Sequence, residues 1–403
     1  MSKFDFEHML ERHGKDAIAV DGLGTMPGMS PDKPKEGFDV IPMWVADMNF
    51  PTAPSIQEEI IERVKHPAFG YFAPTDKYFD AIINWHKDRK GVADLKKEYI
   101  GYENGVLGGV VSALNVFCSR GDNVLVHAPT YIGFTMSLEN NGYNIIHSEL
   151  IKDKDGEWVM DYEDMERKIV DYKIGATVFC NPHNPTGRVW TKEEIKKAMD
   201  IFEKHHVKVV SDEIWSDLLM NGNKYTPTQS VSTYARENTV ALYAPSKTFN
   251  LAGLVGSYHV IYNEYLRNRV IKESSLPHYN DMNVLSMHAL IGAYSPTGEA
   301  WLDELLEVLS KNVNYGVDYI RKNFEGVSVN KAQGTYMLFL NLKDYCEKNN
   351  TDVGEVLKKG WDVGVAWQDG RPFKDPYAIR MNLAVPYDKV VEAFARLSKY
   401  VFN

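Results

Sequence analysis

The sequence predicts an α/β protein with a mostly parallel sheet, joined to a smaller α+β unit. Between residues 123 and 262, short apolar runs alternate with helical segments, which is typical of parallel strands connected by covering helices. After about residue 290 a long helical stretch precedes short strands of alternating polarity. A chain of 403 residues is long enough for two such units.

The first 40 residues are polar and rich in glycine and proline, so we expect an extended arm. The alternative is a frayed tail, but the apolar stretch from Met43 to Phe50 follows at once and needs burial. The predicted domains are therefore an arm at 1–50 that joins the small domain, a large domain at 51–290 and a small domain at 291–403.

Individual elements follow from the same patterns. Capping boxes at Ser55–Glu58 and Thr191–Glu194 predict helices that extend to about Lys65 and His205. A helix is also expected at 301–323, and another at 388–400. The predicted strands are 123–127, 143–149, 176–180, 207–210, 240–243, 258–262, 335–340 and 378–383.

Composition narrows the class of protein. A formal net charge of -10 and the lack of a long basic run argue against a nucleic acid partner. The three cysteines are far apart and odd in number, so we expect a reducing compartment rather than a disulfide framework. The N-terminus lacks the apolar core of a signal peptide, and no apolar stretch is long enough to span a bilayer. These features predict a cytoplasmic protein with no membrane partner.

Three polar residues each follow an apolar strand. Asn184 comes after 176–180, Asp212 after 207–210 and Lys247 after 240–243. Ligands of open α/β sheets bind outside the carboxyl ends of the strands, so one crevice could collect an amide, a carboxylate and an amine. An enzyme that uses pyridoxal 5'-phosphate (PLP) needs such groups, because a lysine forms the Schiff base and an acid pairs with the pyridinium nitrogen.

Each of these residues also has a plainer interpretation. Most lysines are solvated, but Lys247 lies in a Ser/Thr-rich turn after an apolar strand, where partial desolvation makes an amine nucleophilic. Asp212 could cap a helix, although a carboxylate at the end of so apolar a strand is costly unless it is paired. Asn184 could form an Asx-turn in its proline-rich loop.

A glycine-rich turn at 103–109 leads into an apolar helical stretch. Backbone N–H groups at such a turn can converge on an anion, although a plain turn is more common. Together with Lys247, the turn predicts a phosphate site formed by the Val106 and Leu107 amides and the Ser246 hydroxyl.

Arg380 lies on an alternating strand, on the face opposite Ile379 and Met381. Its guanidinium suits a bidentate carboxylate, whereas the alternative is a surface arginine. His183 lies in the loop before Asn184, and no metal-binding spacing accompanies it, so we expect loop structure and no metal site.

Asn184, Asp212 and Lys247, in this order and context, resemble the cofactor residues of fold-type I PLP enzymes, the aspartate aminotransferase superfamily. The stretches 41–50 and 246–254 are similar to the MalY/PatB branch of cystathionine β-lyase-like C–S lyases, and the likeness spans nearly the whole chain. The resemblance implies the fold-type I transferase fold, PLP as cofactor and a homodimer with shared active sites.

The resemblance also implies roles for single residues. Tyr131 would stack on the PLP ring, and Tyr71 would reach the phosphate of the neighbouring subunit; packing is the alternative for both. Asn184 would bond the cofactor's ring oxygen. Arg380, with Asn184 and Trp44, would bind the substrate.

Two positions depart from the wider superfamily. Many aminotransferases carry an arginine eight residues after the Schiff-base lysine, where this chain has Val255, and the C–S lyase branch commonly lacks it too. Trp215, three residues after Asp212, replaces a tyrosine or histidine that can bond the cofactor oxygen. Because an indole only donates, Trp215 could instead wall the substrate pocket.

The predicted activity is PLP-dependent β-elimination from cystathionine or an S-substituted L-cysteine, giving pyruvate, ammonia and a thiol. A class I/II aminotransferase using the same residues is the first alternative. A PLP-binding regulatory protein without turnover is the second, and the intact lysine, aspartate and arginine weigh against it.

Overall fold

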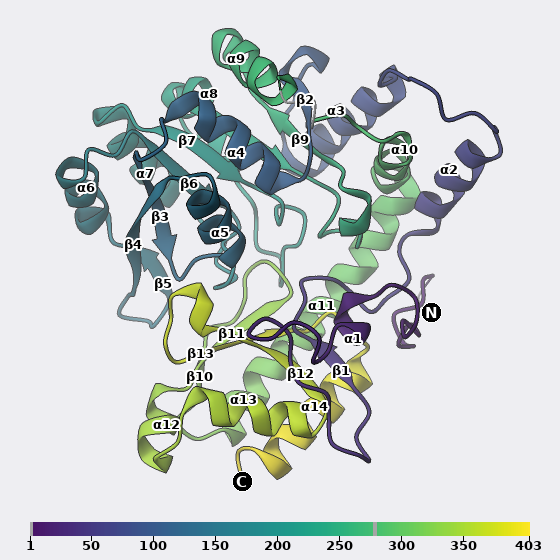
Figure 1. Cartoon of the computed structure of the whole chain (residues 1–403), viewed down its shortest axis with the longest axis vertical. Helices are drawn as coiled ribbons and strands as arrows, with labels where there is room; N and C mark the ends of the chain where they lie inside the picture. Colours follow the sequence, from purple (N-terminus) through teal and green to yellow (C-terminus); the bar gives the residue numbers. More distant parts are fainter. Residues whose placement is uncertain (1–2, 277–279) are drawn as a thin grey trace.

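The computed structural model describes residues 3–276 and 280–403, and within them the chain forms two β-sheets (Figure 1). In this described part, the larger sheet has eight strands in the order β2-β9-β8-β7-β6-β3-β4-β5. These strands are β2 (Ile100–Glu103), β3 (Asn123–Ala128), β4 (Asn144–Lys152), β5 (Trp158–Met160), β6 (Ala176–Cys180), β7 (Lys208–Asp212), β8 (Thr239–Tyr243) and β9 (Ser257–Val260).

The middle of the larger sheet is parallel, as predicted. Strands β4, β3, β6, β7 and β8 pair in parallel, whereas β5, β9 and β2 join the two sides antiparallel. Every residue of β6 and β8 is buried, which explains why their sequences are mostly apolar. The covering helices are α4 (Val106–Phe117), α5 (Ile132–Asn140), α6 (Tyr162–Asp171), α7 (Lys192–Lys204), α8 (Thr233–Asn238) and α9 (Glu264–Ser275).

The smaller sheet combines the two ends of the chain. Its order is β1-β12-β13-β11-β10, and β1 pairs in parallel with β12 while the other pairs are antiparallel. The strands are β1 (Ile41–Met43), β10 (Ser328–Val329), β11 (Met337–Asn341), β12 (Val365–Asp369) and β13 (Ala378–Asn382). The N-terminal segment thus adds a strand to the C-terminal sheet; the boundaries at residues 50 and 290 stay a prediction.

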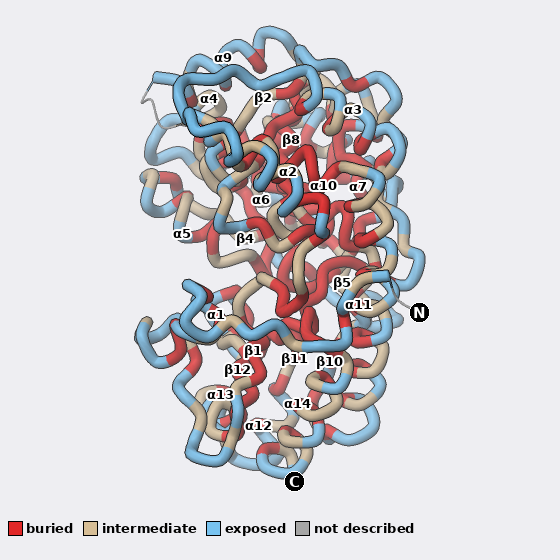
Figure 2. The backbone as a smooth tube through the Cα atoms, turned by 90° about the vertical axis from the view of Figure 1, so that its right-hand side faces the viewer, coloured by how far each residue is buried: buried red, intermediate tan, exposed pale blue. Residues whose placement is uncertain are grey.

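The remaining helices link and flank the two sheets. Figure 1 shows α11 running from α10 toward the smaller sheet. Buried residues fill the interior of both halves, while exposed residues lie on the outer helices and loops (Figure 2). These helices are α1 (Ile18–Asp21), α2 (Pro54–Val64), α3 (Asp76–Lys90), α10 (Val284–Ala293), α11 (Pro296–Asn323), α12 (Lys343–Asn349), α13 (Val353–Asp362) and α14 (Tyr387–Tyr400).

The two predicted capping boxes have different outcomes. Thr191 and Glu194 form the reciprocal box at the start of α7, so that prediction is confirmed. The box at Ser55 is wrong, because α2 already begins at Pro54 and the Ser55 hydroxyl donates instead to the Gly292 carbonyl at 2.7 Å. A proline suits the first helical turn, since it lacks the N–H that would be unsatisfied there.

Candidate active site

The ends of three adjacent parallel strands place Asn184, Asp212 and Lys247 around one cavity. Cys180 at the end of β6 lies opposite Asp212 at the end of β7, and Asp212 lies opposite Leu242 of β8. The loops that leave these strands therefore start at the same edge of the sheet. The cavity is about 220 Å³ in volume. It is also lined by Ala46, Val106, Leu107, Tyr131, Trp215, Ser246 and Val255.

Lys247 carries its amine into this cavity. Its Nζ donates to the Ala46 carbonyl at 2.9 Å and lies 5.9 Å from the centre of the Trp215 ring. Burial and, to a smaller extent, the positive charge of Arg380 together lower the pKa of Lys247 to about 8, although the charges of Asp47 and Asp212 oppose this shift. The amine is therefore much closer to its neutral, nucleophilic form than an exposed lysine.

Asp212 is a buried carboxylate with 4% of its surface exposed. Its Oδ1 accepts a hydrogen bond from the Ile214 backbone N–H at 3.1 Å, and no salt bridge to it is found within residues 3–276 and 280–403. Burial raises the pKa of Asp212 to about 6, although the Ile214 N–H and the charge of Lys247 oppose this shift. Such a group gains stability from a cationic N–H donor supplied by a ligand.

The start of α4 forms one wall of the cavity. Gly105 precedes the helix with a φ of 78°, a left-handed conformation that favours glycine. The Val106 and Leu107 amides are thus the free N–H groups of a helix N-terminus, and the Ser246 hydroxyl lies in the same lining. This arrangement suits an anion such as a phosphate.

Arg380 is a buried cation from the smaller sheet. Its Nη1 donates to the Asn184 Oδ1 at 3.1 Å and its Nη2 to the Trp44 carbonyl at 3.2 Å. Burial lowers the pKa of Arg380 to about 10, and its Nε has no hydrogen-bond partner in the described part of the chain. Because neither contact neutralises the charge, the guanidinium can bind a ligand carboxylate.

Two of the predicted site residues, Trp44 and Tyr71, do not line this cavity. The substrate contact expected of Trp44 stays a prediction: its indole packs with Leu23 and Ala366, and its Nε1 donates to the Ala19 carbonyl at 2.9 Å. The N-terminal arm thus buries this large apolar ring. The contact of Trp44 with Arg380 is made by its backbone carbonyl. The Tyr71 side chain is fully exposed in a separate hollow, so this chain alone does not bring it to the cavity.

Sequence reasoning missed the backbone of segment 44–48. Its carbonyls hold Arg380 and Lys247, and the Asn382 side chain donates to two others, those of Val45 and Asp47, at 2.7 and 2.6 Å. The only signal was that Asn382 shares a strand face with Arg380. The His183 Nδ1 bonds the Thr186 hydroxyl at 2.8 Å, and no group of three or more His, Cys, Asp or Glu side chains that could hold a metal ion occurs among the described residues.

Comparison with known proteins agrees with this geometry. Cystathionine beta-lyase PatB of Bacillus subtilis (strain 168) is 35% identical over 356 residues, which are 88% of this chain and 89% of PatB. Cystalysin from Treponema denticola, whose structure contains a pyridoxal 5'-phosphate cofactor, is 29% identical with a TM-score of 0.89, over 98% of each chain. The PLP-bound C-S lyase from Staphylococcus hominis is 27% identical with a TM-score of 0.88, over 100% of this chain and 99% of that one.

No helix in the described part of the chain is both long and apolar enough to cross a membrane.

The family model described as aminotransferase class I and II matches residues 39–397. That match spans most of the sequence, and PatB supports it at an identity well above chance. The chain therefore belongs to the aminotransferase class I and II family.

Proposed function

We propose that the protein is a PLP-dependent C–S β-lyase that converts cystathionine or an S-substituted L-cysteine into pyruvate, ammonia and a thiol. The observation that carries this proposal is a set of three charged groups, none of which forms an ion pair within the described residues. Lys247 and Asp212 line one cavity, and the buried Arg380 donates to Asn184, which lines the same cavity. The similarity to PatB and to two PLP-bound or PLP-containing lyases supports it.

The cavity residues fit the cofactor. Lys247 would hold PLP covalently, Asp212 would pair with the ring nitrogen, and Asn184 would bond the ring oxygen. The Val106 and Leu107 amides and the Ser246 hydroxyl would hold the phosphate, with Tyr131 against the ring face. When bound, PLP supplies an electron sink for the charge that develops at the substrate Cα.

The chain's own groups then perform the reaction. Arg380 and Asn184 bind and orient the substrate α-carboxylate. The Lys247 amine would be freed when the substrate amine displaces it from the cofactor, and burial brings it toward its neutral form. It then takes the Cα proton, and the Ala46 carbonyl provides a fixed acceptor for that amine. The thiolate then leaves from Cβ, and water converts the released enamine to pyruvate and ammonia. Trp215 gives the thioether an apolar wall.

Aminotransfer is the competing reaction, because it uses the same lysine, aspartate and arginine. The absence of an arginine at Val255, together with the lyase relatives, favours elimination. We expect L-cystathionine and S-methyl-L-cysteine to give pyruvate and thiol without any added keto acid. If turnover requires 2-oxoglutarate and glutamate accumulates in step, the protein is an aminotransferase. If PLP binds but nothing turns over, a regulatory role replaces both.

The proposal includes a homodimer with shared sites, acting in the cytoplasm. Tyr71 is fully exposed, and Phe69, Ile61 and Val64 expose apolar surface nearby in the chain. The three free cysteines suit a reducing compartment. Tyr71→Ala and Lys247→Ala subunits, each inactive alone, should regain activity when mixed, because a hybrid dimer has one intact site. No recovery after verified subunit exchange would count against shared sites.

A further inference from the structure

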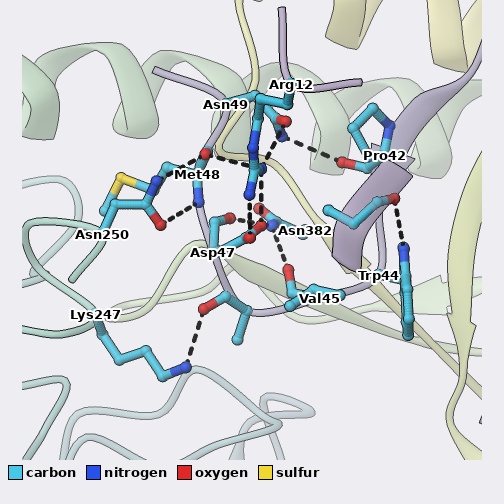
Figure 3. Close-up of polar contacts among 12 residues, drawn as sticks. Arg12, Pro42, Trp44, Val45, Asp47, Met48, Asn49, Lys247, Asn250 and Asn382 are labelled. Atoms are coloured by element: carbon cyan, nitrogen blue, oxygen red, sulfur yellow. Dashed lines mark hydrogen bonds and ion pairs between the residues drawn. The ribbon is translucent and has the colours of Figure 1, made fainter. Parts of the chain in front are cut away.

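Five successive carbonyl oxygens, from Trp44 to Met48, each accept a hydrogen bond from a side chain. Figure 3 shows the side chains of Asn382, Lys247, Asn250 and Arg12 around this segment. Their donors are Arg380 for Trp44, Asn382 for Val45, Lys247 for Ala46, Asn382 for Asp47, and Asn250 together with Arg12 for Met48. The segment 44–48 therefore contacts both cations of the proposed active site. Any shift of its backbone moves the acceptors of Arg380 and Lys247 together.

Arg12, in the N-terminal arm, binds the C-terminal end of this segment. Its Nη2 lies 2.5 Å from the Asp47 Oδ2, and its Nη1 donates to the Asp47 Oδ1 at 3.2 Å, the Met48 carbonyl at 3.1 Å and the Asn49 Oδ1 at 3.0 Å. Only 12% of the Arg12 side chain and 14% of the Asp47 side chain are exposed. Solvent screens such a pair far less than a surface ion pair.

We infer that Arg12 is a positioning residue of the active site, which aligns Arg380 and Lys247 through the carbonyls of segment 44–48. The inference rests on the proposed roles of those two cations. In this interpretation the function of the Trp44–Met48 stretch lies in its backbone carbonyls, which bind the two cations, rather than in its side chains.

Charge gives Arg12 a second effect on the same residues. Without its guanidinium, the Asp47 carboxylate would be a poorly solvated anion with no ion-pair partner among the described residues. Its charge already acts on Lys247, whose pKa it raises against the stronger effect of burial. An unneutralised Asp47 would therefore compete with the substrate carboxylate for positive charge.

The test measures two equilibrium constants on the PLP-loaded enzyme and its Arg12→Ala variant. The first is the Kd of L-alanine, an amino acid without a leaving group at Cβ, followed by the visible absorption of the cofactor. The second is the Kd of PLP, measured by adding PLP to the same two proteins after the cofactor has been removed. We expect L-alanine to bind about tenfold more weakly to Arg12→Ala, since small misplacements of binding groups are costly. The Kd of PLP should rise by much less, because the proposed phosphate and ring contacts do not involve segment 44–48.

Lys35→Ala is the matched control. Lys35 also links the arm to the rest of the protein, through an ion pair with Asp362 at 2.8 Å, and its side chain is 70% exposed. Within the described residues it forms no hydrogen bond or ion pair with segment 44–48. Lys35→Ala should bind L-alanine as the wild type does. The double variant Arg12→Ala/Asp47→Asn should recover part of the affinity lost in Arg12→Ala, because the competing carboxylate is gone.

The inference is overturned if Arg12→Ala binds L-alanine as tightly as the wild type, or if the Kd of PLP rises in the same proportion. If Arg12→Ala does not fold, Arg12→Gln replaces it, with the same criteria, because glutamine keeps N–H donors but no charge. L-alanine binding needs no elimination step, so a failure of the proposed lyase reaction would be seen separately, as absence of pyruvate.

Discussion

Asp212 and Glu213 are neighbours in the chain, yet they lie in two regions that differ in how buried charged groups are paired. Glu213 belongs to a region where such groups have several protein partners, and Asp212 to one where they have few. Glu213 accepts hydrogen bonds from the Ser211 and Tyr243 hydroxyls, both at 2.8 Å, and from the Thr228 N–H at 3.2 Å. In the same region the buried Lys90 forms an ion pair with Asp217 and donates to the Ser216 hydroxyl at 2.7 Å. We call this set, with Trp85, the rear network.

Around the cavity, by contrast, the charged side chains form no ion pair with another described residue. Asp212 has one backbone donor, Lys247 one carbonyl acceptor, and Arg380 two neutral acceptors. Burial without a partner is unfavourable unless a ligand supplies the missing charge. The comparison indicates that the rear network stabilises the fold, whereas the cavity reserves its charges for a cofactor and a substrate.

The largest expected effect is that of Lys247→Ala, which removes the amine proposed both to hold PLP and to take the Cα proton. We expect pyruvate formation from an S-alkyl cysteine to fall by about 10⁴-fold or more, since covalent attachment and proton transfer are lost together. Borohydride should fix PLP to Lys247 in the wild type and not in the variant. Peptide mass spectrometry locates the adduct, and an adduct on another lysine contradicts the assignment.

Arg380→Ala should have the next largest effect. Loss of one partner from a buried charge pair costs about 3–5 kcal/mol, so kcat/KM should drop by about a thousandfold. Steady-state assays over a range of substrate concentrations measure this, and PLP content measured by absorption serves as the control. A normal KM in the variant would place the carboxylate elsewhere.

The same contrast explains what the sequence could reveal. Asn184, Asp212 and Lys247 could be predicted because parallel strands end at one edge, so position after a strand determines where a residue lies. The contacts of Trp44 and Ser55 depend on carbonyl acceptors supplied by distant segments, which no local pattern encodes. Strand β2 was missed since its sequence Ile-Gly-Tyr-Glu is short and weakly apolar. The role of Tyr71 stays a prediction, because the proposed contact needs a second subunit.

Lys90→Met tests the rear network and should lower stability rather than activity. Breaking a buried pair leaves Asp217 without its cation, although Trp85 Nε1 still donates to it at 3.1 Å. The free energy of unfolding should therefore fall by about 3 kcal/mol, near the lower end for such pairs. Urea unfolding measures the loss, and kcat/KM should change little. An active-site defect at normal stability would show that this lysine serves the cavity instead.

Lys247→Met should raise the free energy of unfolding of the cofactor-free protein, whereas Lys90→Met should lower it. Because Lys247 has no carboxylate in contact among the described residues, burial lowers its pKa from 10.5 to about 8. Below pH 8 the lysine is protonated in both the folded and unfolded states, and the folded state bears the full cost of the buried charge. Between pH 8 and 10.5 the unfolded chain binds more protons than the folded protein, so the wild type gains stability as the pH rises.

We therefore expect Lys247→Met to raise the free energy of unfolding by about 3 kcal/mol at pH 7, the equivalent of the pKa shift. This advantage should shrink steadily above pH 8 and vanish near pH 10.5. Urea unfolding of cofactor-free wild type and variant at pH 7 and 9 gives both differences, with Lys90→Met measured alongside. Equal destabilisation by the two substitutions at pH 7 would contradict the contrast between cavity and rear network, because the two buried lysines would then contribute alike to the fold.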